Sequence, residues 1–270
     1  MWVRFDRVIV AVRELDAALD GYARLLGRAP LCFDGALGPG ARFQLGNGAL
    51  ELRAVQDGAA NGPFGIALGV DDASACSLWL AGRGIDARLE KRAAELRDGG
   101  SLASSELELD AAQTRGVRIA AVEQLEPEDG FPPAAVQGEA GATVAGIDHV
   151  VIRSPAAAAA IELYRDRLGI RLALDRTFPE RGTRLSFLRV GGVTLELASR
   201  MGAPADAGSS DAIWGIAYQV TDPHAARERV AAAGLDVSEL RRGNKPGTLV
   251  CTVRSGTCDV PTLLIGPERA

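Results

Sequence analysis

The sequence contains few of the side chains that most often perform catalysis or bind metals. Only two histidines, His149 and His224, occur in its 270 residues. The spacing of the four cysteines matches no zinc-binding or redox motif, and a chain of this length does not depend on disulfides. We therefore expect reduced, mostly buried thiols.

The sequence also lacks a basic surface and a long uncharged apolar segment. Its net charge is −5, and charges of both signs are interspersed, so the sequence contains no basic patch that would bind nucleic acid or anionic lipid. The N-terminal apolar run carries charges inside it, unlike a signal peptide, and no stretch is long enough to cross a membrane. Since 47% of the residues are hydrophobic, a folded, soluble, cytoplasmic protein is expected.

What the sequence does contain is an internal repeat. Residues 5–12 (FDRVIVAV) align with residues 147–154 (IDHVVIRS), and the alignment continues with a few insertions as far as residues 84–86 and 234–236. The aligned pairs include Asp6 with Asp148, Arg7 with His149, Glu51 with Glu196, and Gly65 with Gly215. A duplication of this length predicts two similar folded units.

Each half is itself a repeat of two units. Short β-branched runs bounded by glycine and proline predict strands, and apolar spacing with glycine stops predicts helices, among them 73–82, 162–168 and 224–233. The result is four units of one strand, one helix and three strands. Residues 126–144 are rich in proline, glycine and alanine, which predicts a linker between domains at 1–125 and 145–270.

The hairpin of residues 187–196 shows which side chains share a face. With Gly191 and Gly192 as a two-residue turn, counting outward pairs the strands. One face is aliphatic and is expected to pack on the helix; it holds Leu188, Val190, Val193 and Leu195. The other is mixed, as a ligand-facing surface would be; it holds Phe187, Arg189, Thr194 and Glu196.

The strand at 147–153 divides in the same way. His149, Val151 and Arg153 lie on one face. We therefore expect His149 and Glu196 to point into one concavity. In the first half, the matching hairpin turns at Gly46 and Asn47 and offers an ion-pair network in place of a metal site; its members are Arg7, Arg42, Gln44 and Glu51.

The segments GIDHVVIRS, ELYRDRLGI, GGVTLELA and WGIAYQVTD resemble the vicinal oxygen chelate superfamily, which includes glyoxalase I, extradiol dioxygenases, methylmalonyl-CoA epimerase and bleomycin-resistance proteins. The resemblance covers both halves. It implies an α+β fold of tandem βαβββ modules, giving two glyoxalase-like domains that each form an incomplete barrel around a cup. It also implies one divalent metal held by up to four side chains.

In this sequence the resemblance places two of those metal ligands at His149 and Glu196, which suit Zn, Ni, Mn or Fe. The other two positions fall on Gly215 and near Leu263, which supply no side-chain ligand. In the first domain, the positions read Arg7, Glu51, Gly65 and about Ala120, so that domain lacks a metal site. The resemblance implies that a ring-cleaving dioxygenase binds iron through a facial triad of two histidines and one carboxylate, and of these this sequence retains only His149.

Several roles remain open for these residues. His149 and Glu196 are candidate catalytic residues; the structural alternatives are a His149–Glu196 hydrogen bond and an ion pair from Glu196 to Arg189 or Arg153. The candidate substrate-binding residues are Phe187, Arg189, Arg153, Cys251 on a strand expected to face the cup, and Lys245 in a loop at its mouth. His224 is expected on the surface, and Trp214 and Tyr218 in the core.

Three functions follow as hypotheses. The first is a glyoxalase-type lyase or isomerase acting on a small molecule in the C-terminal cup, assisted by one divalent metal. The second is a metal-free protein that binds or sequesters a small molecule, as resistance proteins do. The third is a ring-cleaving dioxygenase. The chain is expected to be a monomer or a homodimer.

Overall fold

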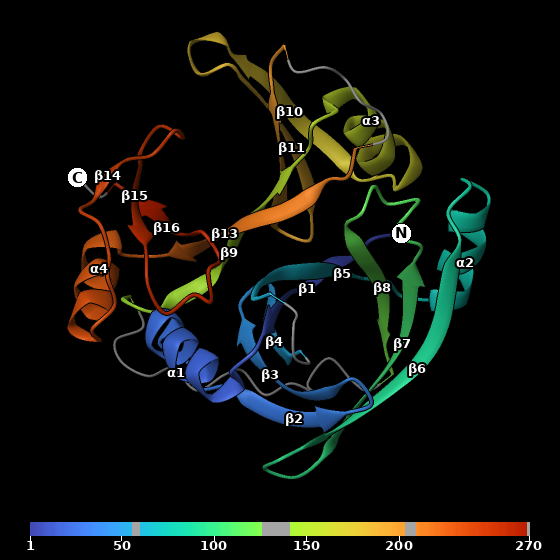
Figure 1. The fold of residues 1–270 in the computed structure, drawn as a ribbon, viewed down its shortest axis with the longest axis horizontal. Coiled ribbons are helices and arrows are strands. Elements are labelled where there is room, and N and C mark those ends of the chain that lie inside the picture. Colours follow the sequence, from blue (N-terminus) through green and yellow to red (C-terminus); the bar gives the residue numbers. More distant parts are fainter. Residues whose placement is uncertain (56–59, 126–140, 203–208, 269–270) are drawn as a thin grey trace.

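The computed structural model describes residues 1–55, 60–125, 141–202 and 209–268. The four expected units of strand, helix and three strands are all present (Figure 1). Within these described ranges, no helix is both long and apolar enough to cross a membrane. The expected linker lies mostly outside them, so the division at residues 125 and 145 stays a prediction.

The first half holds two of the units. Its elements are β1 (Arg4–Val12), α1 (Leu15–Leu26), β2 (Leu31–Gly35), β3 (Gly38–Leu45), β4 (Gly48–Ala54), β5 (Gly62–Gly69), α2 (Ala73–Ala81), β6 (Ala87–Leu96), β7 (Ser101–Leu109) and β8 (Arg118–Gln124). The strands form one closed barrel in the order β1-β4-β3-β2-β6-β7-β8-β5. Closure differs from the incomplete barrel expected for this half.

The second half repeats the same order. Its elements are β9 (Val144–Arg153), α3 (Ala157–Ile161) continuing as the π-helix η2 (Glu162–Arg167), β10 (Arg171–Phe178), the 3-10 turn η3 (Pro179–Arg181), β11 (Thr183–Val190), β12 (Val193–Arg200), β13 (Ala212–Val220), α4 (Pro223–Ala232), β14 (Arg241–Arg242), β15 (Thr248–Val253) and β16 (Thr262–Pro267). These strands form an open sheet in the order β10-β11-β12-β9-β13-β16-β15-β14.

One pair of edge strands explains why one sheet closes and the other does not. In the first half, β2 pairs with β6, as in Phe33 with Leu96. The counterparts in the second half, β10 and β14, are the two edges of the open sheet. Because β6 has ten residues and β14 only two, the second half has too little strand to complete the circle. The second sheet is thus the incomplete barrel that was predicted.

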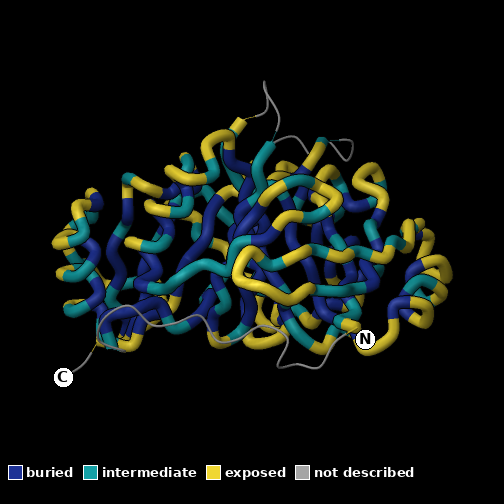
Figure 2. The backbone as a smooth tube through the Cα atoms, turned by 90° about the horizontal axis from the view of Figure 1, so that it is seen from below, coloured by how far each residue is buried: buried dark blue, intermediate teal, exposed yellow. Residues whose placement is uncertain are grey.

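The apolar residues are placed by strand alternation. The predicted aliphatic face of the β11–β12 hairpin is fully buried, with Leu188, Val193 and Leu195 at 0% exposure. It belongs to one core cluster that joins both halves. Figure 2 shows this distribution: buried segments run through the middle of the molecule, and exposed segments lie on its outside.

Candidate functional site

The open side of the second sheet forms a cup of about 750 Å³. The corresponding space inside the closed barrel is only about 60 Å³, although a separate hollow of about 490 Å³ lies among residues such as Arg4, Asn47 and Gln124. The sheet that fails to close therefore offers a larger space than either of these two hollows.

The β11–β12 hairpin lines one wall of this cup, as predicted. Its register pairs Phe187 with Glu196 and Arg189 with Thr194, and all four side chains face the cup. Gly191 and Gly192 have φ of 53° and 83°, which is the positive-φ turn expected at these positions.

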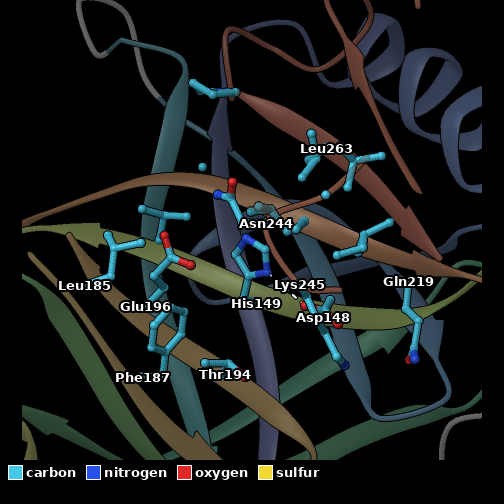
Figure 3. A pocket seen from close by; sticks show the side chains of 18 of the residues that line it. Asp148, His149, Leu185, Phe187, Thr194, Glu196, Gln219, Asn244, Lys245 and Leu263 are labelled. Carbon is cyan, nitrogen blue, oxygen red and sulfur yellow. Dashed lines mark hydrogen bonds and ion pairs between the residues drawn. The ribbon is translucent and has the colours of Figure 1, made fainter. Parts of the chain in front are cut away.

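The strand β9 supplies His149 and Val151 to the cup floor, but it also supplies Asp148. The pairing of β9 with β13 skips from Ile147 to His149, so Asp148 is the extra residue of a β-bulge. The bulge turns Asp148 toward the same side as its neighbour. His149 Nδ1 lies 2.9 Å from Asp148 Oδ1 (Figure 3). This contact replaces the expected alternative of a His149–Glu196 hydrogen bond.

Asp148 is a site residue that the sequence reasoning missed. The hydrogen bond from His149 lowers the pKa of the Asp148 carboxyl, against the effect of burial, and the charges of His149, Lys245 and Arg189 act in the same direction. The repeat held a signal, because Asp6 aligns with Asp148. In β1 the pairing likewise skips Asp6, and Asp6 contacts the following Arg7 at 2.5 Å.

Glu196 stands in the wall without a partner among the described residues. It is half-buried, and neither Arg189 nor Arg153 forms the ion pair considered for it. Burial raises the pKa of the Glu196 carboxyl, and the charge of His149 only partly offsets this. An acidic side chain with no local compensation faces the interior of the cup.

Two predicted substrate contacts need correction. Cys251 is 0% exposed and belongs to the core, while its neighbours Val250 and Thr252 line the cup. Strand alternation therefore turns the Cys251 thiol away from any ligand, and burial raises its pKa to about 11. Arg153 does not line the cup; its guanidinium lies 4.1 Å from the ring centroid of Trp214, which does.

The aromatic residues of β13 divide differently from the prediction. Tyr218 is buried, as expected. Trp214 is 40% exposed and lines the cup, because the pairing of β13 with β9 has an irregularity between Ile213 and Gly215. His224 lies exposed on the first turn of α4, and Lys245 lies exposed at the rim of the cup, both as predicted.

The residues present do not fit a resident metal ion. At the third ligand position, a Cβ on Gly215 would lie 2.6 Å from the carbonyl oxygen of Pro261, so the backbone leaves no room for a ligand side chain. The fourth position is the apolar Leu263, and Asp148 Oδ1 is engaged by His149. Within the described residues, no group of three His, Cys, Asp or Glu side chains is placed to hold a metal.

In the first half, ion pairs occupy the space inside the barrel that corresponds to the cup. Arg7 Nε lies 2.9 Å from Glu51, Arg7 Nη2 lies 2.7 Å from Glu106, and Arg42 Nη2 lies 2.6 Å from Glu51. Arg53 also contacts Glu51. The predicted network is confirmed for Arg7, Arg42 and Glu51, whereas the Gln44 amide donates to backbone carbonyls.

The fold defines a class of protein built from paired βαβββ modules around a cup. Residues 148–252 match the model of the Glyoxalase/Bleomycin resistance protein/Dioxygenase superfamily. This match covers the cup-forming half of the chain and agrees with the resemblance seen in the sequence. A comparison with curated proteins gave no match.

Solved structures of this fold span the whole chain. One is a mutant of 4-hydroxymandelate synthase from Streptomyces coelicolor, with a TM-score of 0.66 and 16% identity over 99% of this chain and 93% of that chain. Another is the Mn(II)-bound glyoxalase from Novosphingobium aromaticivorans, with a TM-score of 0.66 and 17% identity over 99% of this chain and 83% of that chain. At such identities, the likeness establishes the fold.

Proposed function

We propose that this protein binds a small organic molecule in the C-terminal cup and does so without a resident metal ion. The observation that carries the proposal is the contrast between the two halves. The same modules form a barrel filled with ion pairs in the first half and an open cup of about 750 Å³ in the second. A cup of that size, mostly apolar with a few polar groups, has the character of a small-molecule site.

Ligand binding is tested by thermal shift with a panel of small organic molecules. A ligand of the folded state raises the melting temperature by mass action. Phe187→Ala removes a ring from the cup wall and should abolish the shift. Leu89→Ala, at an exposed position in the first half, should leave it unchanged. A shift that persists in Phe187→Ala would place the ligand elsewhere and contradict the proposal.

A metal-assisted lyase or isomerase is the second candidate, because His149 and Glu196 occupy two of the superfamily's ligand positions in one cup. Metal analysis after loading with Zn, Ni, Mn or Fe separates the two. We expect less than stoichiometric metal. A stoichiometric metal that is lost in His149→Ala and Glu196→Ala would favour the second candidate over the first.

A ring-cleaving dioxygenase is the least supported candidate, since Gly215 and Leu263 stand where its facial triad needs side-chain ligands. We expect no oxygen uptake with catechols in the presence of Fe(II). Uptake that depends on His149 would reinstate this candidate.

A further inference from the structure

The charge of the cup is opposite in sign to that of the chain. Four basic side chains line it, Arg176, Arg189, Arg241 and Lys245, against two acidic ones, Asp148 and Glu196. The chain as a whole carries −5. Such a local excess of positive charge in a concave site concentrates anions there.

None of these four cations forms an ion pair with a carboxylate within the described residues. Arg176 lies over the ring of Phe178, and Arg241 reaches the hydroxyl of Thr252. The Arg189 guanidinium and the Lys245 ammonium make no hydrogen bond or ion pair within the described ranges. In the first half the position of Arg189 is taken by the neutral Gln44, since each stands two residues before its hairpin turn.

Arg189 and Lys245 both line the cup with Asp148. The strand register places Arg189 opposite Thr194 and Thr194 opposite His149, the neighbour of Asp148. In keeping with this placement, the charges of Arg189 and Lys245 both lower the pKa of the Asp148 carboxyl. Asp148 already accepts a hydrogen bond from His149, and its single negative charge offsets only one of the two. For Arg189, Lys245 and Asp148 taken alone, the net charge is about +1, which matches a monoanion such as a carboxylate better than a phosphate dianion.

The wall beside these groups is apolar. Phe187, Leu185 and Trp214 line the cup, and the guanidinium of Arg153 packs on the Trp214 ring from 4.1 Å. Figure 3 shows Phe187 and Leu185 on the side of the cup that carries Glu196. A complementary ligand therefore has a hydrophobic body as well as an anionic group.

Resting on the proposed ligand-binding function, we propose that Arg189 and Lys245 form a carboxylate subsite, so that the cup selects a carboxylic acid whose aromatic or branched apolar body lies against Phe187. Arg189 supplies a forked donor for the two carboxylate oxygens, and Lys245 supplies a point charge from the loop at the rim of the cup. Binding of the ligand at this subsite forms and breaks no covalent bond.

The test compares acids with their neutral amides by calorimetry. Phenylacetate and 3-phenylpropionate should bind about tenfold or more tightly than the corresponding amides, the difference expected for a charge-assisted hydrogen bond. Arg189→Gln and Lys245→Gln should each reduce this preference toward unity. Arg200→Gln and Lys91→Gln, which change the same residue types outside the cup, should preserve it.

Added salt gives a readout that needs no variant. Acid binding should weaken as the ionic strength rises, while amide binding stays constant. Equal binding of acids and amides would overturn the subsite and leave the cup as a neutral ligand site. Tighter binding of phenyl phosphate than of the acids would overturn the assignment to a carboxylate. If neither acids nor amides bind, the carboxylate subsite is overturned, whereas the proposed function fails only if no member of the thermal-shift panel binds in the cup.

Discussion

Glu51 and Glu196 occupy the same place in the two halves but have opposite surroundings. Although Glu51 is buried, Arg7, Arg42 and Arg53 hold the pKa of its carboxyl well below the usual value. Glu196 receives no comparable partner among the described residues, and burial raises the pKa of its carboxyl. The charged form of Glu51 is thus favoured by the fold of the first half, whereas the charged form of Glu196 is disfavoured by the fold of the second.

The first prediction concerns this pair of carboxylates at pH 7. Glu51→Gln should lower the free energy of unfolding by about 3–5 kcal/mol, because it removes the buried carboxylate that Arg7, Arg42 and Arg53 share. Glu196→Gln should instead raise the melting temperature by about 1–3 °C, because it removes a half-buried charge without compensation. Urea and thermal unfolding measure both changes.

The pH dependence of these two variants should also have opposite signs. Glu196 has a raised pKa when folded, so the native state binds more protons and stability falls as the pH rises above about 4.5. The advantage of Glu196→Gln should therefore vanish below that pH. Glu51 has a lowered pKa when folded, so its contribution is present above about 4.5 and is lost as the pH falls. A benefit of Glu196→Gln that persists at pH 3 would contradict this account.

At the scale of elements, hairpins could be read from the sequence because their turns fix the register. Glycine at 191 and 192 determines that Phe187 opposes Glu196, and alternation then assigns every side chain of both strands to a face. The same count placed Arg42 opposite Glu51 in the first half. The wall of the cup was therefore predictable from two glycines.

The bulges were not predictable in this way. An inserted residue at Asp148 or an irregularity before Gly215 leaves no compositional mark, yet each changes which side chain meets the cup. The closure of the first barrel was missed for a related reason. It depends on the length of β6 and its pairing with β2, a contact between segments far apart in sequence.

The second prediction tests the turn between β11 and β12. A Cβ at Gly191 would lie 2.1 Å from the backbone nitrogen of Phe5, whereas at Gly182 it would meet nothing within 4 Å. Both residues have positive φ. Gly182→Ala should cost about 1 kcal/mol from backbone strain alone. Gly191→Ala should cost clearly more, because it also pushes the hairpin away from β1. Equal losses in chemical denaturation would show that the contact with β1 adds nothing.

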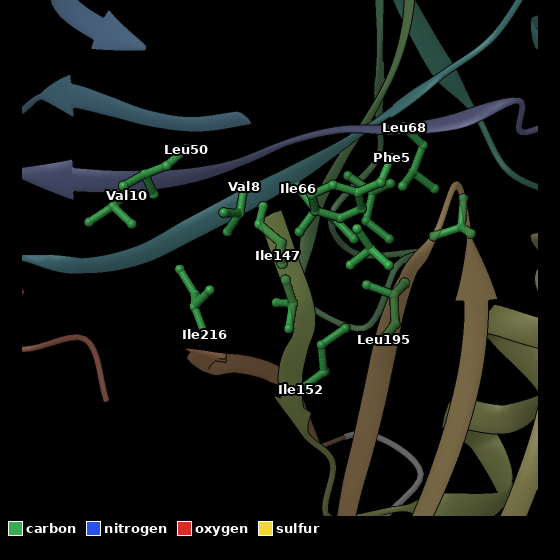
Figure 4. Packing of buried hydrophobic residues seen from close by; sticks show 14 of the residues in the cluster. Phe5, Val8, Val10, Leu50, Ile66, Leu68, Ile147, Ile152, Leu195 and Ile216 are labelled. Carbon is green, nitrogen blue, oxygen red and sulfur yellow. The ribbon is translucent and has the colours of Figure 1, made fainter. Parts of the chain in front are cut away.

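At the scale of the whole molecule, the two halves are packed as one body. The back faces of their sheets meet along Val8, Val10 and Ile66 from the first half and Ile147, Ile152 and Ile216 from the second (Figure 4). The helices also cross between halves: Arg229 on α4 donates to the backbone carbonyl of Arg24 on α1 at 2.5 Å, and Arg167 donates to the carbonyl of Arg83 at 3.1 Å. The halves should therefore unfold together.

The last prediction tests this coupling through Gly21 on α1, where a Cβ would lie 2.4 Å from the carbonyl oxygen of Gly256 in the other half. In an isolated helix, glycine to alanine stabilises by about 1 kcal/mol. Here the clash with a rigid backbone should reverse the sign and cost about 1–3 kcal/mol. Gly82→Ala is the matched control, because Gly82 ends α2 at φ −62° and its nearest neighbours would be 3.6 Å away.

The measurement is urea unfolding followed by circular dichroism and by tryptophan fluorescence. Gly82→Ala should leave the midpoint unchanged or raise it slightly. Gly21→Ala should lower the midpoint equally in both signals, because disturbing α1 loosens the helix–helix contact and with it the shared core. Two separated transitions in Gly21→Ala would mean that the second half keeps its cup without the first.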